Sequence, residues 1–259
     1  MVQTHFNILD IDLDFFLNNK HASFSDPKGR LDDKQYIPWN IDDVIKFFDV
    51  RCGLNKNNKT SGKCFVHHDE VFYFLRELQE KNDFNLKFSI DHIDAHADLG
   101  YGDCSYAYIF SEILFKDLKE RSYPNKINGR CGLGKGNFLA FAIACRWVTK
   151  LRYINKKEWS EDLPQLLFHD YDITSNFIEL KKFTPDMMDL IISYVDIIKK
   201  AKETSPLELE PKVPFETIEY STFQNKIPYD FIFLTHSPNY TPPTSDDLIP
   251  IIKEYIYIQ

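Results

Sequence analysis

Short apolar runs that end in polar side chains recur along this chain. Near the N-terminus, Asp10, Asp12 and Asp14 alternate with apolar residues. A repeat of two predicts a β-strand with one acidic face and one apolar face. Further apolar runs predict strands at residues 64–66, 86–90, 151–154, 166–172 and 229–234.

Apolar residues at helical spacing separate these strands. Ile41, Val44 and Phe48 share one helix face, which predicts a helix that begins after Asn40 and ends at Gly53. Similar patterns predict helices at residues 69–82, 111–120, 137–149 and 184–203, and a C-terminal helix that opens at 245–247. This alternation indicates an α/β fold of three αβα layers with a mainly parallel sheet. The 259 residues suit a single domain, residues 1–259.

Ligand-type side chains follow three of the predicted strands. They are Asp12 and Asp14, the pair His67 and His68, and Asp94, His96 and Asp98. The carboxyl ends of parallel strands meet at one edge of a sheet, so we expect these side chains to lie close together. Neighbouring histidines face opposite ways, so at most one of the pair can be a ligand. Carboxylate and imidazole ligands suit a divalent metal such as Mn²⁺ or Zn²⁺.

The N-terminal acids leave two arrangements open. Asp10 faces the same way as Asp12 and Asp14, so it either orients the ligands or takes the place of one of them. Three carboxylates on one strand face repel one another unless a cation neutralises them.

These motifs resemble those of a known family. Asp94-Ala-His96-Ala-Asp98 resembles the Asp-Ala-His-x-Asp signature of the arginase (ureohydrolase) superfamily, Asp12-Leu-Asp14 resembles its second Asp-x-Asp motif, and His68 resembles its additional metal-binding histidine. The Asp-x-Asp motif comes first here instead of last. This order, together with residues 237–243, is similar to a divergent branch, the peptide arginases that convert arginine to ornithine within ribosomally made peptides.

The resemblance implies a hydrolase of the guanidinium group of arginine residues. Its cofactor would be two Mn²⁺ ions, and its partner an arginine-containing precursor peptide. A hydroxide bridging the two ions would attack the guanidinium carbon, which releases urea and leaves ornithine. The four acids among the six ligands balance the charge of two divalent ions. The ligands would be Asp12, Asp14, His68, Asp94, His96 and Asp98.

Two further residues are candidates for catalytic roles. In free-arginine arginases a histidine follows a Gly-Asn element and shuttles protons, but here Phe138 follows Asn137. We therefore expect His236, after the last strand, to protonate the leaving amine; a structural histidine is an equally open interpretation. Glu70 is the candidate that anchors the guanidinium, and its alternative role is to orient His68.

Polar segments that follow the ligand-bearing strands are expected to form the rim of the site. Residues 17–38 and 99–108 are such segments, and we expect them to line an open cleft that admits a peptide. A second Asp-x-Asp element, Asp170 and Asp172, ends the predicted strand 166–172. It is either a turn at a strand end or a substrate-binding element.

Composition narrows the classes of partner. The net charge of −8 argues against nucleic acid and is compatible with a cationic substrate. The five cysteines are odd in number and lack CxxC spacing, which favours reduced thiols in a cytoplasmic protein. No signal peptide is expected, because acids stand where an apolar core would be needed, and the longest apolar run, residues 138–145, is too short for a membrane span.

Two other functions stay open at this stage. A zinc-dependent deacetylase or amidohydrolase of the same fold would use one metal ion, and a scaffold protein would use none. Oligomerisation also stays open.

Overall fold

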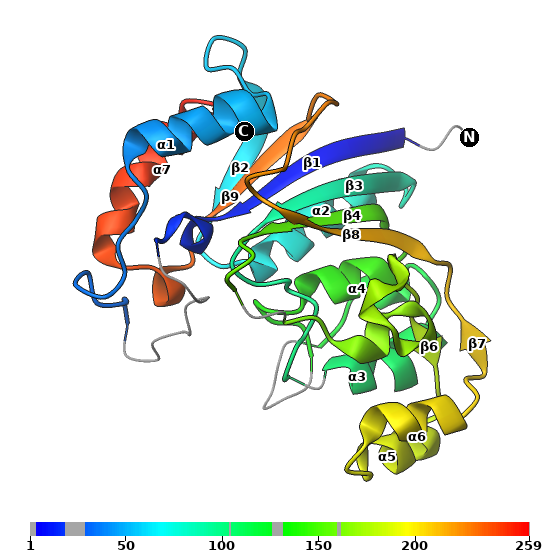
Figure 1. The fold of residues 1–259 in the computed structure, drawn as a ribbon. Coiled ribbons are helices and arrows are strands. Elements are labelled where there is room, and N and C mark those ends of the chain that lie inside the picture. The colour runs from blue at the N-terminus through cyan, green and yellow to red at the C-terminus, as the bar shows by residue number, and fades with distance from the viewer. Residues whose placement is uncertain (1–3, 19–28, 104, 126–131, 160–161, 259) are drawn as a thin grey trace.

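A mainly parallel sheet of eight strands forms the centre of the protein (Figure 1). The structure, a computed structural model, describes residues 4–18, 29–103, 105–125, 132–159 and 162–258. The strand order is β10-β2-β9-β1-β3-β4-β8-β5. The strands are β1 Thr4–Asp12, β2 Thr60–Phe65, β3 Leu86–Ile93, β4 Val148–Asn155, β5 Phe177–Ile178, β8 Val213–Glu219, β9 Phe231–Thr235 and β10 Ile256–Ile258. All pairs are parallel except β5 with β8, so the α/β prediction is confirmed.

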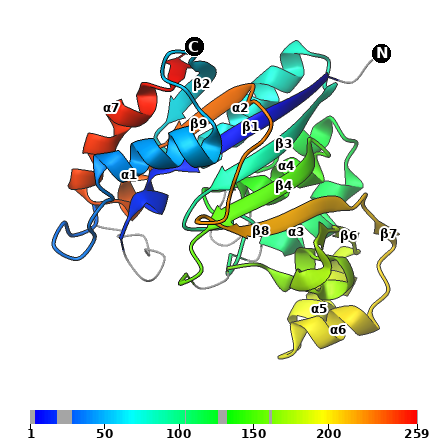
Figure 2. The ribbon, with the colours of Figure 1, turned by 45° about the horizontal axis from the view of Figure 1, so that its top comes forward.

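Helices cover both faces of the sheet. The helices are α1 Ile41–Lys46, α2 Asp69–Lys81, α3 Ser105–Ser111, α4 Phe138–Ala144, α5 Pro185–Ile192, α6 Ile197–Glu203 and α7 Leu248–Lys253. Figures 1 and 2 show α1 and α7 on one side of the sheet and α2, α3 and α4 on the other. The short strands β6, Lys181–Lys182, and β7, Glu208–Leu209, pair beside α5 and α6.

The alternation within β1 divides the interior into two cores. Ile8 packs with α2 and α4, whereas Leu9 and Ile11 pack with α1 and α7. Asp10 and Asp12 share the side of Ile8, because side chains two residues apart lie on the same face of a strand. The acidic face of β1 therefore points towards the α2 and α4 side.

Several predicted elements are confirmed with shifted ends. The helix after Asn40 forms α1 and continues as a π-helical turn, Phe47–Cys52, which ends at Gly53 with φ of 67°. Asn40 caps it by accepting a hydrogen bond from the amide of Asp43. The predicted helix 137–149 ends at Ala144, because β4 already begins at Val148 and takes those residues into the sheet.

Three other element predictions are wrong. Residues 166–172 form short 3-10 turns instead of a strand, with Asp170 in left-handed backbone. The helix predicted at 111–120 lies earlier, as α3, which ends where that helix was expected to begin. The helix predicted at 184–203 is two helices, since Asp196 caps α6 separately by accepting from the amide of Lys199.

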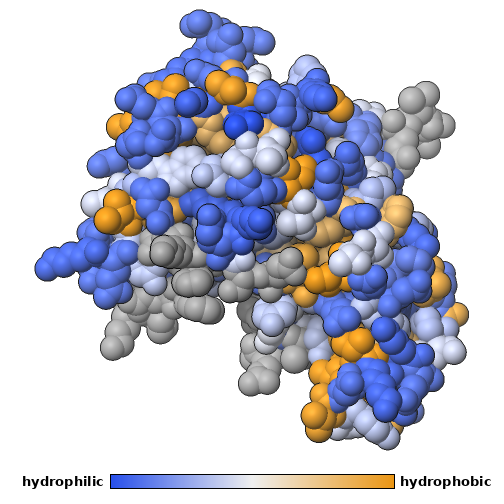
Figure 3. Space-filling view, in the orientation of Figure 1, coloured by the Kyte–Doolittle hydropathy of each residue, from blue (hydrophilic) through white to orange (hydrophobic). Residues whose placement is uncertain are grey.

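The surface and the cysteines complete the description. Figure 3 shows hydrophobic side chains gathered over α5 and α6, where Leu190 and Val195 are exposed. Cys52, Cys64 and Cys145 are free thiols, and the other two cysteines lie outside the described residues. Within the described part of the chain, none of the helices is both long and apolar enough to cross a lipid bilayer.

Candidate metal centre

The end of β1 delivers three buried carboxylates to one edge of the sheet. Asp10 and Asp12 lie on the strand, but Asp14 lies in the 3-10 turn Leu13–Phe16 that follows it. The Asp12 side chain caps this turn by accepting a hydrogen bond from the Asp14 amide at 3.2 Å. The turn keeps Asp14 with the other two acids, while Phe15 and Phe16 pack with α1 and α7.

His68 lies at the centre of the site. It occupies the N-cap position of α2, where its ring is 2% exposed. Its Nδ1 lies 3.1 Å from Asp12 Oδ2, 3.1 Å from Asp94 Oδ2 and 2.9 Å from Asp98 Oδ2. One ring nitrogen carries at most one proton, so it can donate to only one of these three oxygens.

The residues after β3 form a loop that turns three ligand-type side chains inward. We expected Asp94, His96 and Asp98 to project from an extended strand end, but β3 stops at Ile93. The amide of His96 donates to Asp94 Oδ1 at 2.7 Å, which bends the chain, and Asp98 has a φ of 48°. The side chains still converge, because the turns in this loop replace the alternation of a strand.

Asp94 lies between two groups of ligand atoms. Its Oδ2 faces His68 Nδ1, and its Oδ1 lies 3.7 Å from His96 Nδ1. Asp14 Oδ2 lies 3.2 Å from the same nitrogen of His96. One group therefore contains Asp12, His68 and Asp94, and a second contains Asp14, Asp94 and His96, each with its ligand atoms within 4.8 Å of one another.

Asp10 connects the outer nitrogens of two histidines. Its carboxylate lies 3.1 Å from His68 Nε2 and 2.8 Å from His92 Nδ1. His92 is fully buried on β3, on the same side of the sheet as Asp10. An acid that accepts from the outer nitrogen of a ligand histidine holds its ring in place. The contact with His68 supports the orienting role of Asp10.

His92 is a site residue that the sequence analysis missed. Its Nε2 lies 3.0 Å from the carbonyl oxygen of His96 and 3.3 Å from Asp94 Oδ2, and with Asp94 and Asp98 it forms a further group of potential ligands. The signal was present in the sequence, because His92 and Asp94 are two residues apart. Ser237 was noted only as part of a motif, and its hydroxyl donates to Asp12 Oδ2 at 2.5 Å.

The buried charges shift several pKa values. Burial and the neighbouring Asp94 raise the pKa of Asp98 to about 7. Burial, Asp12 and Asp94 raise the pKa of Asp14 well above its usual value. Burial alone would lower the pKa of His92, but its hydrogen bond with Asp10 and the charge of Asp94 raise it to about 9. Each shift reflects an excess of negative charge in a dry environment.

The donor set fits a divalent metal ion. The buried side-chain atoms that have no hydrogen-bond partner among the described residues include four at this centre: Asp14 Oδ2, His68 Nδ1, Asp94 Oδ2 and Asp98 Oδ2. All four belong to the side chains that converge here. Unpaired buried carboxylates are costly unless a cation neutralises them. These buried Asp and His groups can therefore hold a metal ion.

Glu70 does not join the convergent groups. Its Oε2 accepts a hydrogen bond from the amide of Val66 at 3.2 Å, next to the start of α2. It also lines a cavity of about 320 Å³ with Lys63 and Arg76. No contact joins it to His68 among the described residues, so the geometry gives Glu70 a partner outside the cluster.

His236 also has a partner outside the cluster. Its Nε2 lies 2.8 Å from Asp246 Oδ1, and Arg30 pairs with the same carboxylate at 2.7 Å. Leu234 packs on the α1 and α7 side of the sheet, and His236 comes two residues later. Among the described residues, no hydrogen bond or ion pair joins His236 to the six predicted ligands, although the neighbouring Ser237 donates to Asp12.

Asp162 is a further acid next to the loop after β3. Its Oδ2 accepts a hydrogen bond from the amide of Ala97 at 2.9 Å. Its Oδ1 is buried and has no hydrogen-bond partner among the described residues. Burial raises its pKa, and the charges of His96 and Asp94 also act on it. The sequence analysis missed Asp162, since it belongs to no motif and comes close to the cluster only in three dimensions.

Aromatic rings pack against two of the histidines. Phe138, the residue after Gly136-Asn137, lies with its ring centroid 4.7 Å from that of His68. The ring of Tyr240 meets the ring of His96 edge-on at 5.3 Å. These contacts exclude water from one side of His68 and from one edge of His96.

The structure describes only parts of the predicted rim segments, so the open cleft stays a prediction. Residues 19–28 of the segment 17–38 lie outside the described residues, and residue 104 is the corresponding gap in 99–108. Arg30 ties the first segment to the C-terminal region through Asp246, Thr241 and Pro242. Asp172 accepts from the amide and hydroxyl of Thr174, which is the role of a turn residue.

The chain matches no protein-family model, no curated protein and no solved structure in the comparisons made with them.

Proposed function

We propose that this protein is a metal-dependent hydrolase of the guanidinium group of arginine residues in a peptide, giving ornithine and urea. The proposal includes two Mn²⁺ ions held by Asp12, Asp14, His68, Asp94, His96 and Asp98. The observation that carries it is the position of Asp94, whose two oxygens face different histidines. A carboxylate in that position suits two ions better than one, and the resemblance to ureohydrolases supplies the reaction class.

The side chains have distinct roles in this proposal. Bound divalent ions would supply an activated water nucleophile at neutral pH. Asp10 would hold the His68 ring through Nε2, and Phe138 would keep water from one face of that ring. The mostly oxygen ligand set favours Mn²⁺ over softer ions.

The guanidinium of the substrate needs a carboxylate oxygen that has no hydrogen-bond partner within the protein. A guanidinium stays protonated at any working pH and is best held by carboxylate oxygens. Glu70 and Asp162 each use one oxygen to accept from a backbone amide, of Val66 and of Ala97, but the second oxygen of Asp162 is buried without a partner beside the loop that carries the ligands. Asp162 is therefore the anchor that the geometry favours, with Glu70 as the alternative.

Proton transfer to the leaving amine is assigned to His236 in this proposal. Its partner Asp246 would hold the ring in place. Replacement of His236 by Asn should lower kcat, leave the metal content unchanged and remove one limb of the pH–rate curve. An unaltered pH profile would return His236 to a structural role with Asp246.

The decisive experiment measures metal per chain together with urea release. We expect two Mn²⁺ ions per chain, urea from an arginine-containing peptide, and a much lower kcat/KM for free L-arginine. A peptide with lysine in place of arginine is the matched control. One tightly held ion, or activity with Zn²⁺ alone, would favour a deacetylase instead, and comparable kcat/KM values would overturn the assignment to peptides.

A further inference from the structure

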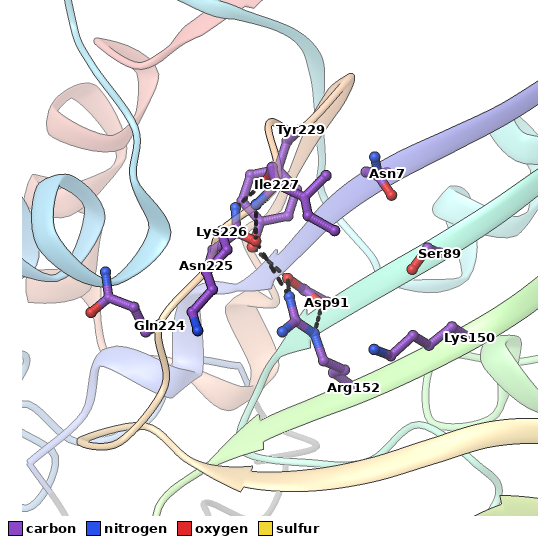
Figure 4. Close-up of a pocket in the computed structure, with 10 residues that line it drawn as sticks. All are labelled: Asn7, Ser89, Asp91, Lys150, Arg152, Gln224, Asn225, Lys226, Ile227 and Tyr229. Atoms are coloured by element: carbon purple, nitrogen blue, oxygen red, sulfur yellow. Dashed lines mark hydrogen bonds and ion pairs between the residues drawn. The ribbon is translucent and has the colours of Figure 1, made fainter.

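A second polar site lies on the opposite side of the sheet from Asp10 and Asp12 (Figure 4). Asp91 on β3 and Arg152 on β4 are register partners there. They lie on the side of Ile93 and Ile154, which pack in the core beneath α1 and α7. Residues 224–229 face the pair across a cavity of about 330 Å³.

The acid of this pocket is already neutralised. Arg152 donates to both oxygens of Asp91, at 2.6 and 2.5 Å, and the hydroxyl of Tyr229 donates to the same carboxylate at 2.5 Å. Asp91 is 4% exposed. A bidentate pair with a third donor satisfies a carboxylate, so Asp91 needs no further cation.

The basic groups of the pocket remain available. Lys150 and Lys226 line it, and neither has an ion pair or a hydrogen bond from its ammonium among the described residues. In the same part of the chain, Arg152 uses Nε and Nη2 in hydrogen bonds but not Nη1. Three cations against one acid leave a net charge of +2 in the pocket (3 − 1), on a protein whose net charge is −8.

The walls of the pocket are polar and fixed. Ser89 and Asn7 stand on β3 and β1 in the row that pairs with Lys150, where apolar residues would close the surface. Figure 4 shows Lys150 extending from β4 towards Arg152. The opposite wall is held by Asn225, whose amide donates to the carbonyl oxygen of Arg51 at 2.8 Å. A preformed wall lowers the entropic cost of binding.

We propose that this pocket binds an oxyanion, the phosphate or carboxylate group of a small molecule, through Lys150, Lys226 and Nη1 of Arg152. A volume of about 330 Å³ admits a small molecule but not a folded partner. The anion balances the cations that Asp91 leaves unpaired. This site is independent of the metal centre and does not rest on the proposed hydrolase activity.

The test is the melting temperature of the full chain in rising concentrations of inorganic phosphate or acetate, at an ionic strength kept constant with chloride. We expect a saturable rise with at least one of the two anions, and the comparison of the two shows whether phosphate or carboxylate is preferred. The double variant Lys150→Gln/Lys226→Gln should weaken the apparent affinity at least about tenfold, as expected for lost charged hydrogen bonds.

The matched control is Lys199→Gln/Lys202→Gln, which removes two exposed lysines of α6 and should leave the response unchanged. All four lysines are exposed, so both variants should fold. If the two double variants respond equally to the anions, the proposal is overturned. Anion binding at the metal centre would give that result. So would the absence of a rise with both anions.

Discussion

Two buried acidic regions of this protein are neutralised in different ways. On one side of the sheet, Asp91 has Arg152 and Tyr229 as partners, and its charge is balanced within the chain. At the carboxyl edge, five buried carboxylates form ion pairs only with three histidines among the described residues. The Asp91 carboxylate is fully neutralised by its own partners, whereas the carboxylates of the second region lack positive charge.

This difference separates a structural acid from a ligand. Asp91 and Asp94 are three residues apart and both are nearly fully buried. The oxygens of Asp91 all have donors, whereas Asp94 Oδ2 has no hydrogen-bond partner among the described residues. Burial alone does not identify a metal ligand. The balance of donors around each oxygen does.

The largest expected contrast comes from replacing each of these two acids by alanine. Asp94→Ala should abolish urea release and lower metal affinity by more than about 100-fold, beyond the range for residues that only support a ligand. In the metal-free protein, the lost hydrogen bond from the His96 amide and the lost ion pair with His68 are partly offset by relief of the repulsion from Asp14 and Asp98, so stability should fall less than in the Asp91 variant. Metal analysis and thermal unfolding measure both effects.

Asp91→Ala is the matched variant and should behave in the opposite way. It leaves the Arg152 guanidinium without its partner, which should reduce the free energy of unfolding by about 3 kcal/mol. This value is the low end of the roughly 3–5 kcal/mol usual for breaking a buried ion pair. The Arg152 side chain is 20% exposed, so water stabilises part of its charge once Asp91 is removed. Metal content should not change. Loss of metal from this variant would contradict the division between the two regions.

The anchor of the substrate cation is tested by two conservative substitutions. Asp162→Asn should retain both ions, since the amide oxygen of the new side chain can still accept from the Ala97 amide. Its kcat/KM should fall by an amount that corresponds to a loss of roughly 2–4 kcal/mol in transition-state binding. Glu70→Gln should change kcat/KM little. The reverse result would make Glu70 the anchor, and a loss of metal in Glu70→Gln would assign it to the support of His68.

A smaller effect is expected at Asp10. It contacts the outer nitrogens of His68 and His92, so Asp10→Asn should weaken metal binding about 10–100-fold while saturating metal restores the full number of ions. Titration with Mn²⁺ gives both quantities. If one ion is lost even at saturation, Asp10 is itself a ligand.

The last prediction concerns the stability of the metal-free protein as pH changes. The pKa of Asp98, about 7, lies above its ordinary value of 3.8, and that of His92, about 9, lies above 6.5. The folded state therefore keeps protons that the unfolded chain releases, so the free energy of unfolding should fall as pH rises from about 4 to 9. The slope is about 1.4 kcal/mol per pH unit for each proton.

Urea unfolding of the chelated protein at several pH values measures this dependence. Bound metal displaces these protons, so the decline should be shallower in the loaded protein. A stability that rises with pH over the same range in the chelated protein would rule out the excess of negative charge at the centre.

The sequence predicted the fold where periodicity and burial agree. β1, α2 and β9 were placed within a few residues, because each carries an unbroken apolar face. β8 was not predicted, because Val213 and Phe215 are its only buried residues and polar residues surround them. It is a strand because it pairs with β4, a contact between distant parts of the sequence. Residues 166–172 read as a strand from their apolar start, yet Asp170 and Tyr171 adopt positive φ values that break it.

The site was predictable as far as it follows motifs. Asp12, Asp14, His68, Asp94, His96 and Asp98 do converge, because each follows a strand whose end meets the same edge. Asp162 and the partners of Glu70 and His236 depend on how loops fold over that edge. No local pattern encodes those contacts, so the sequence could not decide between the roles of Glu70.

The position of β9 has a consequence for biosynthesis. This strand lies between β2 and β1 in the sheet, although 165 residues separate it from the end of β2 and 218 from the end of β1. While a ribosome has yet to make Phe231–Thr235, one edge of β1 and both edges of β2 are left with unpaired amides and carbonyls, because the other neighbour of β2, β10, comes later still. His68 cannot then be held beside Asp12. A nascent chain should consequently need protection from aggregation until β9 and β10 emerge, and the centre could hold a metal ion only after that.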